Sequence, residues 1–229
     1  MKKQTMGMWT EFDVQWDFLT SLVSSVPADP EIVKAWLESR KPPNRPPQSK
    51  SIDEVQQEVL ATLPAEAESG ILVFQRQEGG LVVRMNTIRA HLKDCARILS
   101  TMYVGRVEKE KSFAVKVKDA VYYDPTTYWL PILAQDTDKQ MTVATGSRDV
   151  PIHAMTPMGQ INALKRFEFV ENARLKFKLL VLTPPSGRPV VPLEDLRTLM
   201  MYGGTHGYGG ERSAGEGRYV ATVTQLEAE

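Results

Sequence analysis

The residues with the clearest chemical potential lie in a glycine-rich stretch near the C-terminus, residues 203–217. It contains seven glycines and Arg212, and Arg218 follows it directly. Glycine concentrates where a backbone needs positive φ or must approach another group closely, and successive amides in such a loop can point at one anion. Guanidinium groups suit phosphate oxygens. The stretch predicts a phosphate-binding loop, with a plain surface loop as the alternative. The candidate residues are Gly209, Gly210, Arg212, Ser213, Gly215, Gly217 and Arg218.

Two familiar phosphate-binding motifs do not describe this loop. A dinucleotide fingerprint follows a strand and opens a helix. This loop instead follows an expected helix over 192–201 and precedes an expected strand over 218–226. A P-loop requires Gly-Lys-Ser or Gly-Lys-Thr, and the sequence contains neither. Both nucleotide-binding classes are therefore excluded for this stretch.

Further basic residues cluster in two places outside the loop, at Arg89, Lys93 and Arg97 and at Lys165 and Arg166. The first three recur every four residues in an expected helix over 87–99, so they share one helical face. The last two follow a glycine turn at 156–159 and enter an expected strand. Each cluster is either a phosphate-contacting surface or an ordinary solvated one, and the sequence leaves both interpretations open.

General acid–base chemistry would fall to three histidines, His91, His153 and His206. We expect His91, on a helix, to be a surface or interface residue. His153 or His206 would serve a metal-independent endonuclease. The sequence contains no His-Glu-x-x-His pair and no Gly-x-Ser-x-Gly elbow. We therefore expect no catalytic set, no metal and no cofactor, while enzymatic activity itself stays open.

The composition is that of a globular protein. The chain has 28 basic and 28 acidic residues, so its zero net charge argues against coating nucleic acid by bulk electrostatics. The single cysteine, Cys95, excludes an internal disulfide and a cysteine-rich zinc site, and its helical register with Leu92 and Leu99 predicts a buried thiol. No apolar run qualifies as a signal peptide or a membrane span, so we expect a cytoplasmic protein without a membrane partner.

Apolar periodicity defines the elements that must position the candidate residues. The opening stretch over 9–18 alternates, with Phe12, Val14, Trp16 and Phe18 on one face. Further strands are expected over 113–118, 174–182 and 218–226, with a hairpin over 70–85 that turns at 78–80. Helices are expected over 31–40, 52–63, 87–99 and 192–201.

This mixture predicts an α+β fold, a ferredoxin-like (RRM-like) antiparallel sheet with helices on one face. We expect one domain over residues 1–229, with surface insertions near 41–50 and 134–150.

The C-terminal order of helix, glycine-rich loop and final strand resembles a known family signature. The residues that carry the resemblance are Gly209-Gly-Glu-Arg-Ser-Ala-Gly-Glu-Gly217, followed by Arg218-Tyr-Val. They resemble the C-terminal motif of the RAMP superfamily, the ferredoxin-like RNA-binding proteins of CRISPR effector complexes. Residues 85–97 are similar to the segment where a strand feeds a basic helix in the backbone subunits of those complexes, although the Pro-Gly-Ser lead is absent. The resemblance covers about half the chain.

The resemblance implies an RNA partner, read through its backbone, and further protein subunits or self-association. It is compatible with a phage- or prophage-encoded member. Recognition of this kind adds exposed aromatics on which bases stack, and the sequence offers Tyr128, Tyr202 and Tyr208. RAMP-type processing enzymes often use a histidine, but not usually one from this loop, so that role does not carry over to His206.

Three functions follow in order. The first is a noncatalytic RNA-binding subunit that contacts the RNA backbone through the glycine loop and the basic helix. The second is a metal-independent RNA-processing endonuclease that uses His153 or His206. The third is a structural assembly protein, of a viral kind, with no nucleic-acid partner.

Overall fold

A computed structural model describes residues 8–29, 71–102, 113–156 and 159–226. The helices expected over 31–40 and 52–63, and the insertion expected near 41–50, lie outside the described residues. In the described part of the chain, no helix has both the length and the apolar character needed to cross a bilayer.

The central sheet consists of β1 (Trp9–Phe18), β7 (Val121–Tyr123), β12 (Ala173–Leu182) and β13 (Tyr219–Gln225), in the order β13-β1-β12-β7. The short strand β9 (Leu133–Ala134) also pairs with β12. Every pairing in this sheet is antiparallel. The strands expected over 9–18, 174–182 and 218–226 are confirmed within a residue at each end.

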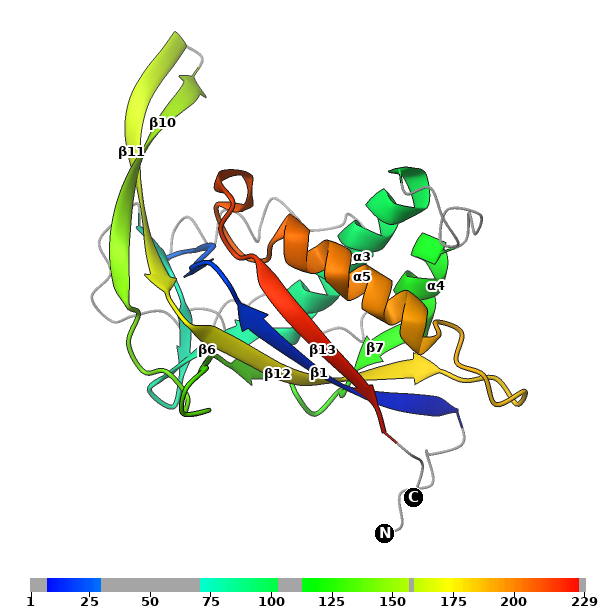
Figure 1. The fold of residues 1–229 in the computed structure, drawn as a ribbon. Coiled ribbons are helices and arrows are strands. Elements are labelled where there is room, and N and C mark those ends of the chain that lie inside the picture. The colour runs from blue at the N-terminus through cyan, green and yellow to red at the C-terminus, as the bar shows by residue number, and fades with distance from the viewer. Residues whose placement is uncertain (1–7, 30–70, 103–112, 157–158, 227–229) are drawn as a thin grey trace, which may run out of the picture.

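Two helices cross the same face of this sheet (Figure 1). Helix α3 (Met85–Met102) connects β1 to β7, and helix α5 (Leu193–His206) connects β12 to β13. Each helix thus joins two parallel strands that are separated by one strand of the other unit. This is the double β-α-β arrangement of a ferredoxin-like fold, and the predicted α+β class is confirmed.

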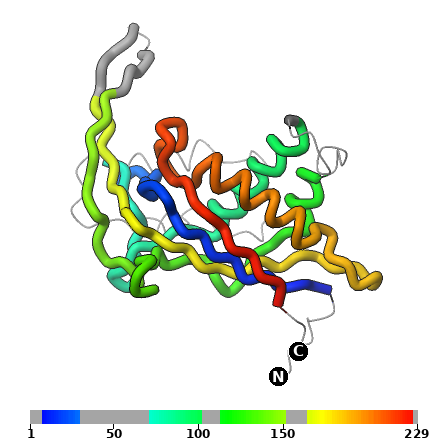
Figure 2. Tube along the Cα trace, in the orientation of Figure 1, coloured from blue at the N-terminus to red at the C-terminus, as the bar shows by residue number. Residues whose placement is uncertain are grey.

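Two insertions extend the core fold. Between β1 and α3 lie β2 (Leu22–Val23), β3 (Val26–Pro27), β4 (Ile71–Val73), β5 (Gln75–Gln77) and β6 (Gly80–Arg84). Between β7 and β12 lie β8 (Trp129–Pro131), β9, β10 (Gly146–Thr156) and β11 (Gly159–Val170). The β10–β11 hairpin leaves the body of the molecule as a long twisted ribbon (Figures 1 and 2).

The insertion strands form two further sheets. One has the order β10-β11-β4-β3, with β2 also paired to β11, and the other has the order β5-β6-β8. The predicted hairpin over 70–85 turns where expected but divides its first strand between these sheets, because β4 pairs with β11 while β5 pairs with β6. In the predicted insertion over 134–150, β10 already begins at Gly146.

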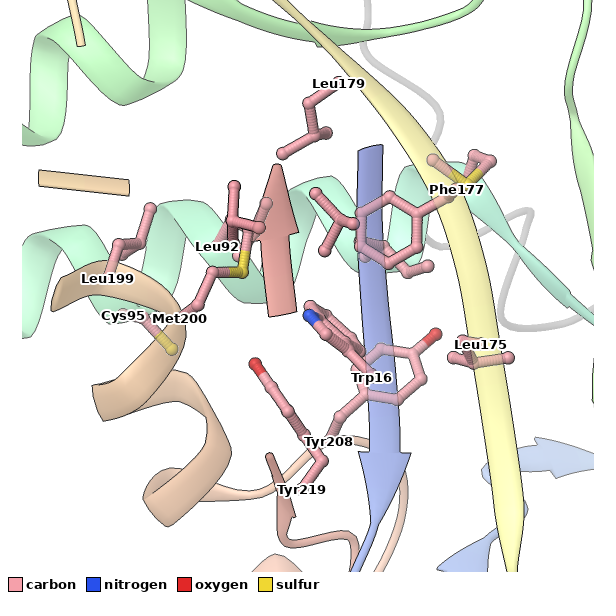
Figure 3. Close-up of a cluster of buried hydrophobic side chains, with 14 of the residues drawn as sticks. Trp16, Leu92, Cys95, Leu175, Phe177, Leu179, Leu199, Met200, Tyr208 and Tyr219 are labelled. Carbon is pink, nitrogen blue, oxygen red and sulfur yellow. The ribbon is translucent and has the colours of Figure 1, made fainter. Parts of the chain in front are cut away.

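The core forms where β1 meets the helices and β13. The four predicted residues of β1 are buried, and Trp16 is fully enclosed. Its ring stacks on Tyr219 at 4.1 Å between centroids and makes edge contacts with Phe177 and Tyr208 (Figure 3). Cys95 is a buried free thiol, as predicted. This cluster therefore ties both β-α-β units together.

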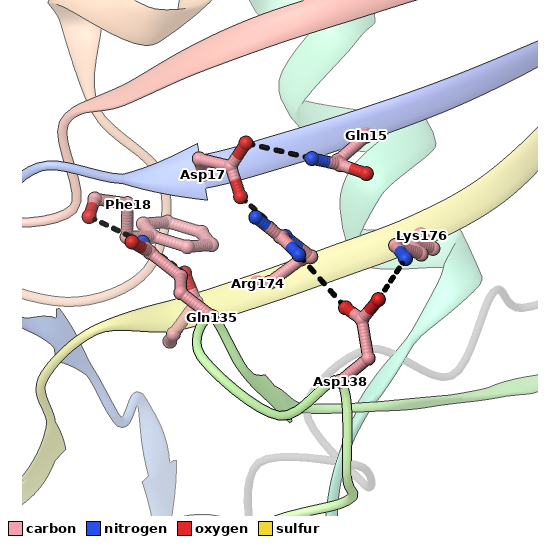
Figure 4. A network of polar contacts seen from close by, with 8 residues as sticks. Gln15, Asp17, Phe18, Gln135, Asp138, Arg174 and Lys176 are labelled. Carbon is pink, nitrogen blue, oxygen red and sulfur yellow. Dashed lines mark hydrogen bonds and ion pairs between the residues drawn. The ribbon is translucent and has the colours of Figure 1, made fainter.

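The other face of the central sheet is polar and pairs its own charges. Arg174 of β12 binds Asp17 of β1 and Asp138 of the loop after β9, and Lys176 binds the same Asp138 at 2.6 Å (Figure 4). Hydrogen bonds from Lys176 and Arg174 hold the pKa of the Asp138 carboxyl below its ordinary value. A face whose cations already bind carboxylates is poorly suited to phosphate.

One predicted strand is a helix. Residues 113–118 alternate as a strand would, but the structure forms helix α4 (Phe113–Ala120) there. Phe113, Val117 and Ala120 are buried while Val115 is 55% exposed. That burial follows the helical spacing of three and four residues, and the short alternation fitted both periods.

Helix α5 also runs further than expected. It ends at His206, so Gly203 and Gly204 belong to the helix and not to the loop. A Cβ on Gly204 would overlap the carbonyl oxygen of Tyr219, and one on Gly203 would overlap the Tyr219 hydroxyl. These two glycines let the helix approach β13 closely, and this packing outweighs their low helix propensity.

Candidate functional site

The glycine loop, defined from here on as residues 207–218, is held firmly in place. The amide of Tyr208 donates to the carbonyl of Gly217 at 2.9 Å and closes the loop on itself. The amides of Gly210 and Gly217 donate to the carbonyls of Val23 and Ser21, both at 2.9 Å. The loop is therefore bonded to the segment that follows β1.

The glycines of the loop are required by its shape and by this contact. Gly207, Gly209, Gly215 and Gly217 all have positive φ, between 72° and 95°. A Cβ on Gly209 would lie 2.7 Å from the carbonyl oxygen of Val23. The close approach that the glycine content predicted is thus made, at this position, to the protein's own backbone.

We predict that Gly209→Ala destabilises the protein by roughly 2–3 kcal/mol, from backbone strain at positive φ and from overpacking against Val23. Gly187→Ala is the matched control, because Gly187 has φ 77° but a Cβ added there would meet no atom within 4 Å. It should cost only about 1 kcal/mol of strain. Urea unfolding of both variants checks the difference, and equal losses would contradict the packing argument.

The loop presents two guanidinium groups to solvent. Arg212 and Arg218 are exposed, and within the described parts of the chain neither side chain pairs with a carboxylate. Nη1 of Arg212 lies 3.1 Å from Nε2 of His206. The amide of Arg218 donates to Oγ1 of Thr20 at 2.9 Å, which fixes its backbone. Both side chains therefore start from a fixed backbone.

The β10–β11 hairpin neutralises the two carboxylates of the loop. Lys165 Nζ lies 2.6 Å from Glu211, and Arg148 Nη1 lies 2.9 Å from Glu216. Arg166, the neighbour of Lys165, instead binds Asp149 across the hairpin at 2.7 Å. Of this predicted pair, the structure brings Lys165 to the loop and gives Arg166 a partner within the hairpin.

The basic residues of α3 are divided by the fold. Arg89 Nη2 donates to the carbonyl of Lys118 at 2.8 Å, and its guanidinium lies 4.5 Å from the ring centroid of Tyr122. Arg89 thus packs on α4 and β7. Arg97 pairs with Asp94 at 2.9 Å and is largely exposed, while Lys93 is partly buried.

A groove of about 360 Å³ joins α3 to the glycine loop. It is bounded by the loop, the first half of α3, the segment 22–26, and strands β5 and β6. Helix α3 contributes Thr87, Ala90, His91 and Asp94, and the loop contributes Tyr208, Gly209 and Arg212. The two stretches with the family resemblance, 85–97 and 209–217, therefore border one groove, although α3 lines it with residues other than its predicted basic ones.

Sequence reasoning missed Arg84, Asp94 and the 22–26 segment as groove residues. Arg84 has a weak signal in the sequence, because it stands directly before the basic helix. Its Nε donates to Gln75 at 3.0 Å and its guanidinium lies 5.3 Å from the centroid of Trp129. Asp94 and the 22–26 segment have no such signal, because only folding brings them to the loop.

His91 is buried, which corrects the expectation of a surface residue. It is 5% exposed, and its Nε2 lies 3.0 Å from the hydroxyl of Tyr219. Burial, reinforced by the nearby charges of His206 and Arg212, lowers the pKa of His91 to about 3. The ring is therefore neutral at physiological pH and serves the core.

Tyr208 also departs from expectation. The sequence predicts an exposed stacking residue, but Tyr208 is 6% exposed and its hydroxyl bonds to Oγ1 of Thr87. Burial raises its pKa to about 12. Tyr202 and Tyr128 are partly buried. Tyr208 thus anchors the glycine loop to the start of α3.

The two catalytic candidates differ in what surrounds them. His206 is the last residue of α5, its Nε2 faces Arg212, and Asp94 Oδ2 lies 3.8 Å away, beyond hydrogen-bond reach. His153 lies in β10 in register with Asn162, and its side chain is outside the described residues. Within the described ranges, no three His, Cys, Asp or Glu side chains are grouped to hold a metal ion.

The fold and this groove define a ferredoxin-like α+β protein with an ordered glycine loop beside its first helix. No known family model matches the sequence, and no curated protein matches it. A solved structure described as "Type IV-B CRISPR Complex" is similar over 93% of this chain and 90% of that chain, with 12% sequence identity and a TM-score of 0.46. At this identity and TM-score, no conclusion about function rests on the likeness.

Proposed function

We propose that this protein is a noncatalytic RNA-binding subunit that holds the RNA backbone at the glycine loop. The observation that carries the proposal is the pair of exposed guanidinium groups, Arg212 and Arg218, on a loop fixed by backbone hydrogen bonds. A preorganised cation loses less entropy on binding than one on a slack loop. Single-stranded RNA is bound largely through such backbone contacts.

Charge pairing around the loop supports the same proposal. Glu211 and Glu216 are each paired with a base of the β10–β11 hairpin. Arg212 and Arg218 therefore add positive charge that no carboxylate of the loop offsets. The neutral net charge of the chain is compatible with this local excess, because the far face of the central sheet pairs its own acids and bases.

The position of the loop agrees with the RAMP resemblance. It lies between the second helix of the ferredoxin-like core and its last strand, where the resembling motif would place it. We extend the proposal to a single RAMP-like domain that works with other subunits or with copies of itself. Arg97 and Lys165 lie beside the loop and extend its basic surface, whereas Arg89 has partners on α4 and β7 and is left out.

The surroundings of His206 argue against catalysis from this site. A general base needs a free lone pair, held in place by a second residue. The Nε2 of His206 faces the guanidinium of Arg212, which can only donate. The buried thiol of Cys95, whose pKa burial raises to about 12, is not a nucleophile at neutral pH.

The test is to incubate purified protein with labelled single-stranded RNA, with and without divalent metal. We expect binding that weakens as salt rises and RNA that stays intact for hours on a denaturing gel. Cleavage by the wild type that His206→Ala or His153→Ala abolishes would establish the endonuclease instead. A protein that forms a defined oligomer and binds no RNA would establish the structural assembly protein.

A further inference from the structure

We propose that the groove beside the glycine loop is a pocket for one unstacked nucleobase; this inference rests on the proposed RNA-binding function. Backbone binding requires only cations along a surface, as Arg212 and Arg218 provide. The groove has features that phosphate does not use, and these features select the ligand.

The floor of the groove is apolar. Val23, Val73, Val82 and Phe74 line it and are all nearly inaccessible to water. An apolar floor repels phosphate but favours the faces of a planar base. Its volume of about 360 Å³ lies at the lower end of the range of small-molecule sites, roughly 300–1,000 Å³. The groove therefore suits one nucleotide unit and not a helical duplex.

The rim of the groove presents both hydrogen-bond donors and acceptors. Arg84 and Arg212 supply donors, and Asp94 supplies carboxylate oxygens. Each is held by another residue, Arg84 by Gln75, Arg212 by His206 and Asp94 by Arg97. Fixed donors and acceptors match the edge of a base, which carries both kinds of group, whereas a phosphate only accepts.

Charge favours a nucleotide over a peptide side chain in this groove. The glycine loop places Arg212 on the rim of the groove, with Arg218 exposed in the same loop. A base that enters the groove brings its own phosphates toward these cations, and an apolar peptide would leave them unused. The ligand is therefore a nucleotide, either one unit of an RNA chain or a free nucleotide.

The test fills the groove without changing charge. Ala90 lines the groove from an exposed position on α3, so Ala90→Leu adds bulk there without an aromatic ring on which a base could stack. Thr101→Leu, exposed at the far end of the same helix, is the control. We expect Ala90→Leu to weaken binding of a short single-stranded RNA about tenfold and Thr101→Leu to leave it unchanged. An RNA of the same length that is abasic throughout should bind both variants and the wild type equally.

The outcomes separate the two proposals. If Ala90→Leu binds normal RNA as the wild type does while RNA binding itself is strong, the pocket is overturned and the backbone function stands. If the wild type binds no RNA, the proposed function fails first. Competition by adenosine, guanosine, cytidine and uridine monophosphates separates the two sources of the base: competition identifies free nucleotides as ligands, and its absence identifies a base within the RNA chain.

Discussion

Replacing both Arg212 and Arg218 by alanine is expected to weaken single-stranded RNA binding roughly a hundredfold. Each exposed guanidinium is proposed to make one charge-assisted contact with a phosphate, worth about 1.5 kcal/mol or more. Two lost contacts should also lower the slope of log affinity against log salt by about 1.4, since single strands give about 0.7 per phosphate contact. Fluorescence anisotropy across a salt series measures both quantities.

A charge-matched control separates local contact from bulk electrostatics. Arg188 and Arg197 are exposed residues of the turn after β12 and of α5, away from the glycine loop. The double variant Arg188→Ala, Arg197→Ala removes the same charge and should bind RNA nearly as the wild type does. Equal losses in the two double variants would mean that the glycine loop has no special role. A thermal melt of each variant shows whether its fold is intact.

Trp16→Ala is expected to cost roughly 3–5 kcal/mol of the free energy of unfolding, which is the largest stability effect that we predict. Trp16 is fully buried, stacks on Tyr219, and makes edge contacts with Phe177 and Tyr208 (Figure 3). Alanine would remove these aromatic contacts and leave a cavity where the two β-α-β units meet. Urea unfolding followed by circular dichroism measures the loss.

Trp16→Phe should cost much less, about 1–2 kcal/mol, because the change in side-chain volume is smaller. Phenylalanine keeps an aromatic ring in the cluster, and it removes an indole Nε1 that is buried without a hydrogen-bond partner in the described structure. Removal of an unsatisfied buried donor recovers part of the desolvation cost. A phenylalanine variant as unstable as the alanine variant would show that the size of the indole, and not the aromatic contacts, sets the stability here.

Local sequence patterns were enough to predict the strands of the central sheet and the class of the fold. The alternation in β1 and the apolar run in β12 are local patterns with a period of two, and each needs only one buried face to be read correctly. The same locality made Cys95 predictable as a buried thiol. Patterns failed where two periods fitted one short segment, as in α4, where Phe113 and Val117 suit both a strand and a helix.

The assembly of the candidate site, by contrast, follows only from tertiary packing. Lys165 reaches Glu211 across 46 positions of sequence, and Gly210 bonds to Val23 from the opposite end of the chain. Arg89 and Arg97 share a helical face by spacing, but α4 takes one and leaves the other to solvent. Packing between distant segments selects which glycines serve the fold and which arginines remain exposed, and no local pattern carries that information.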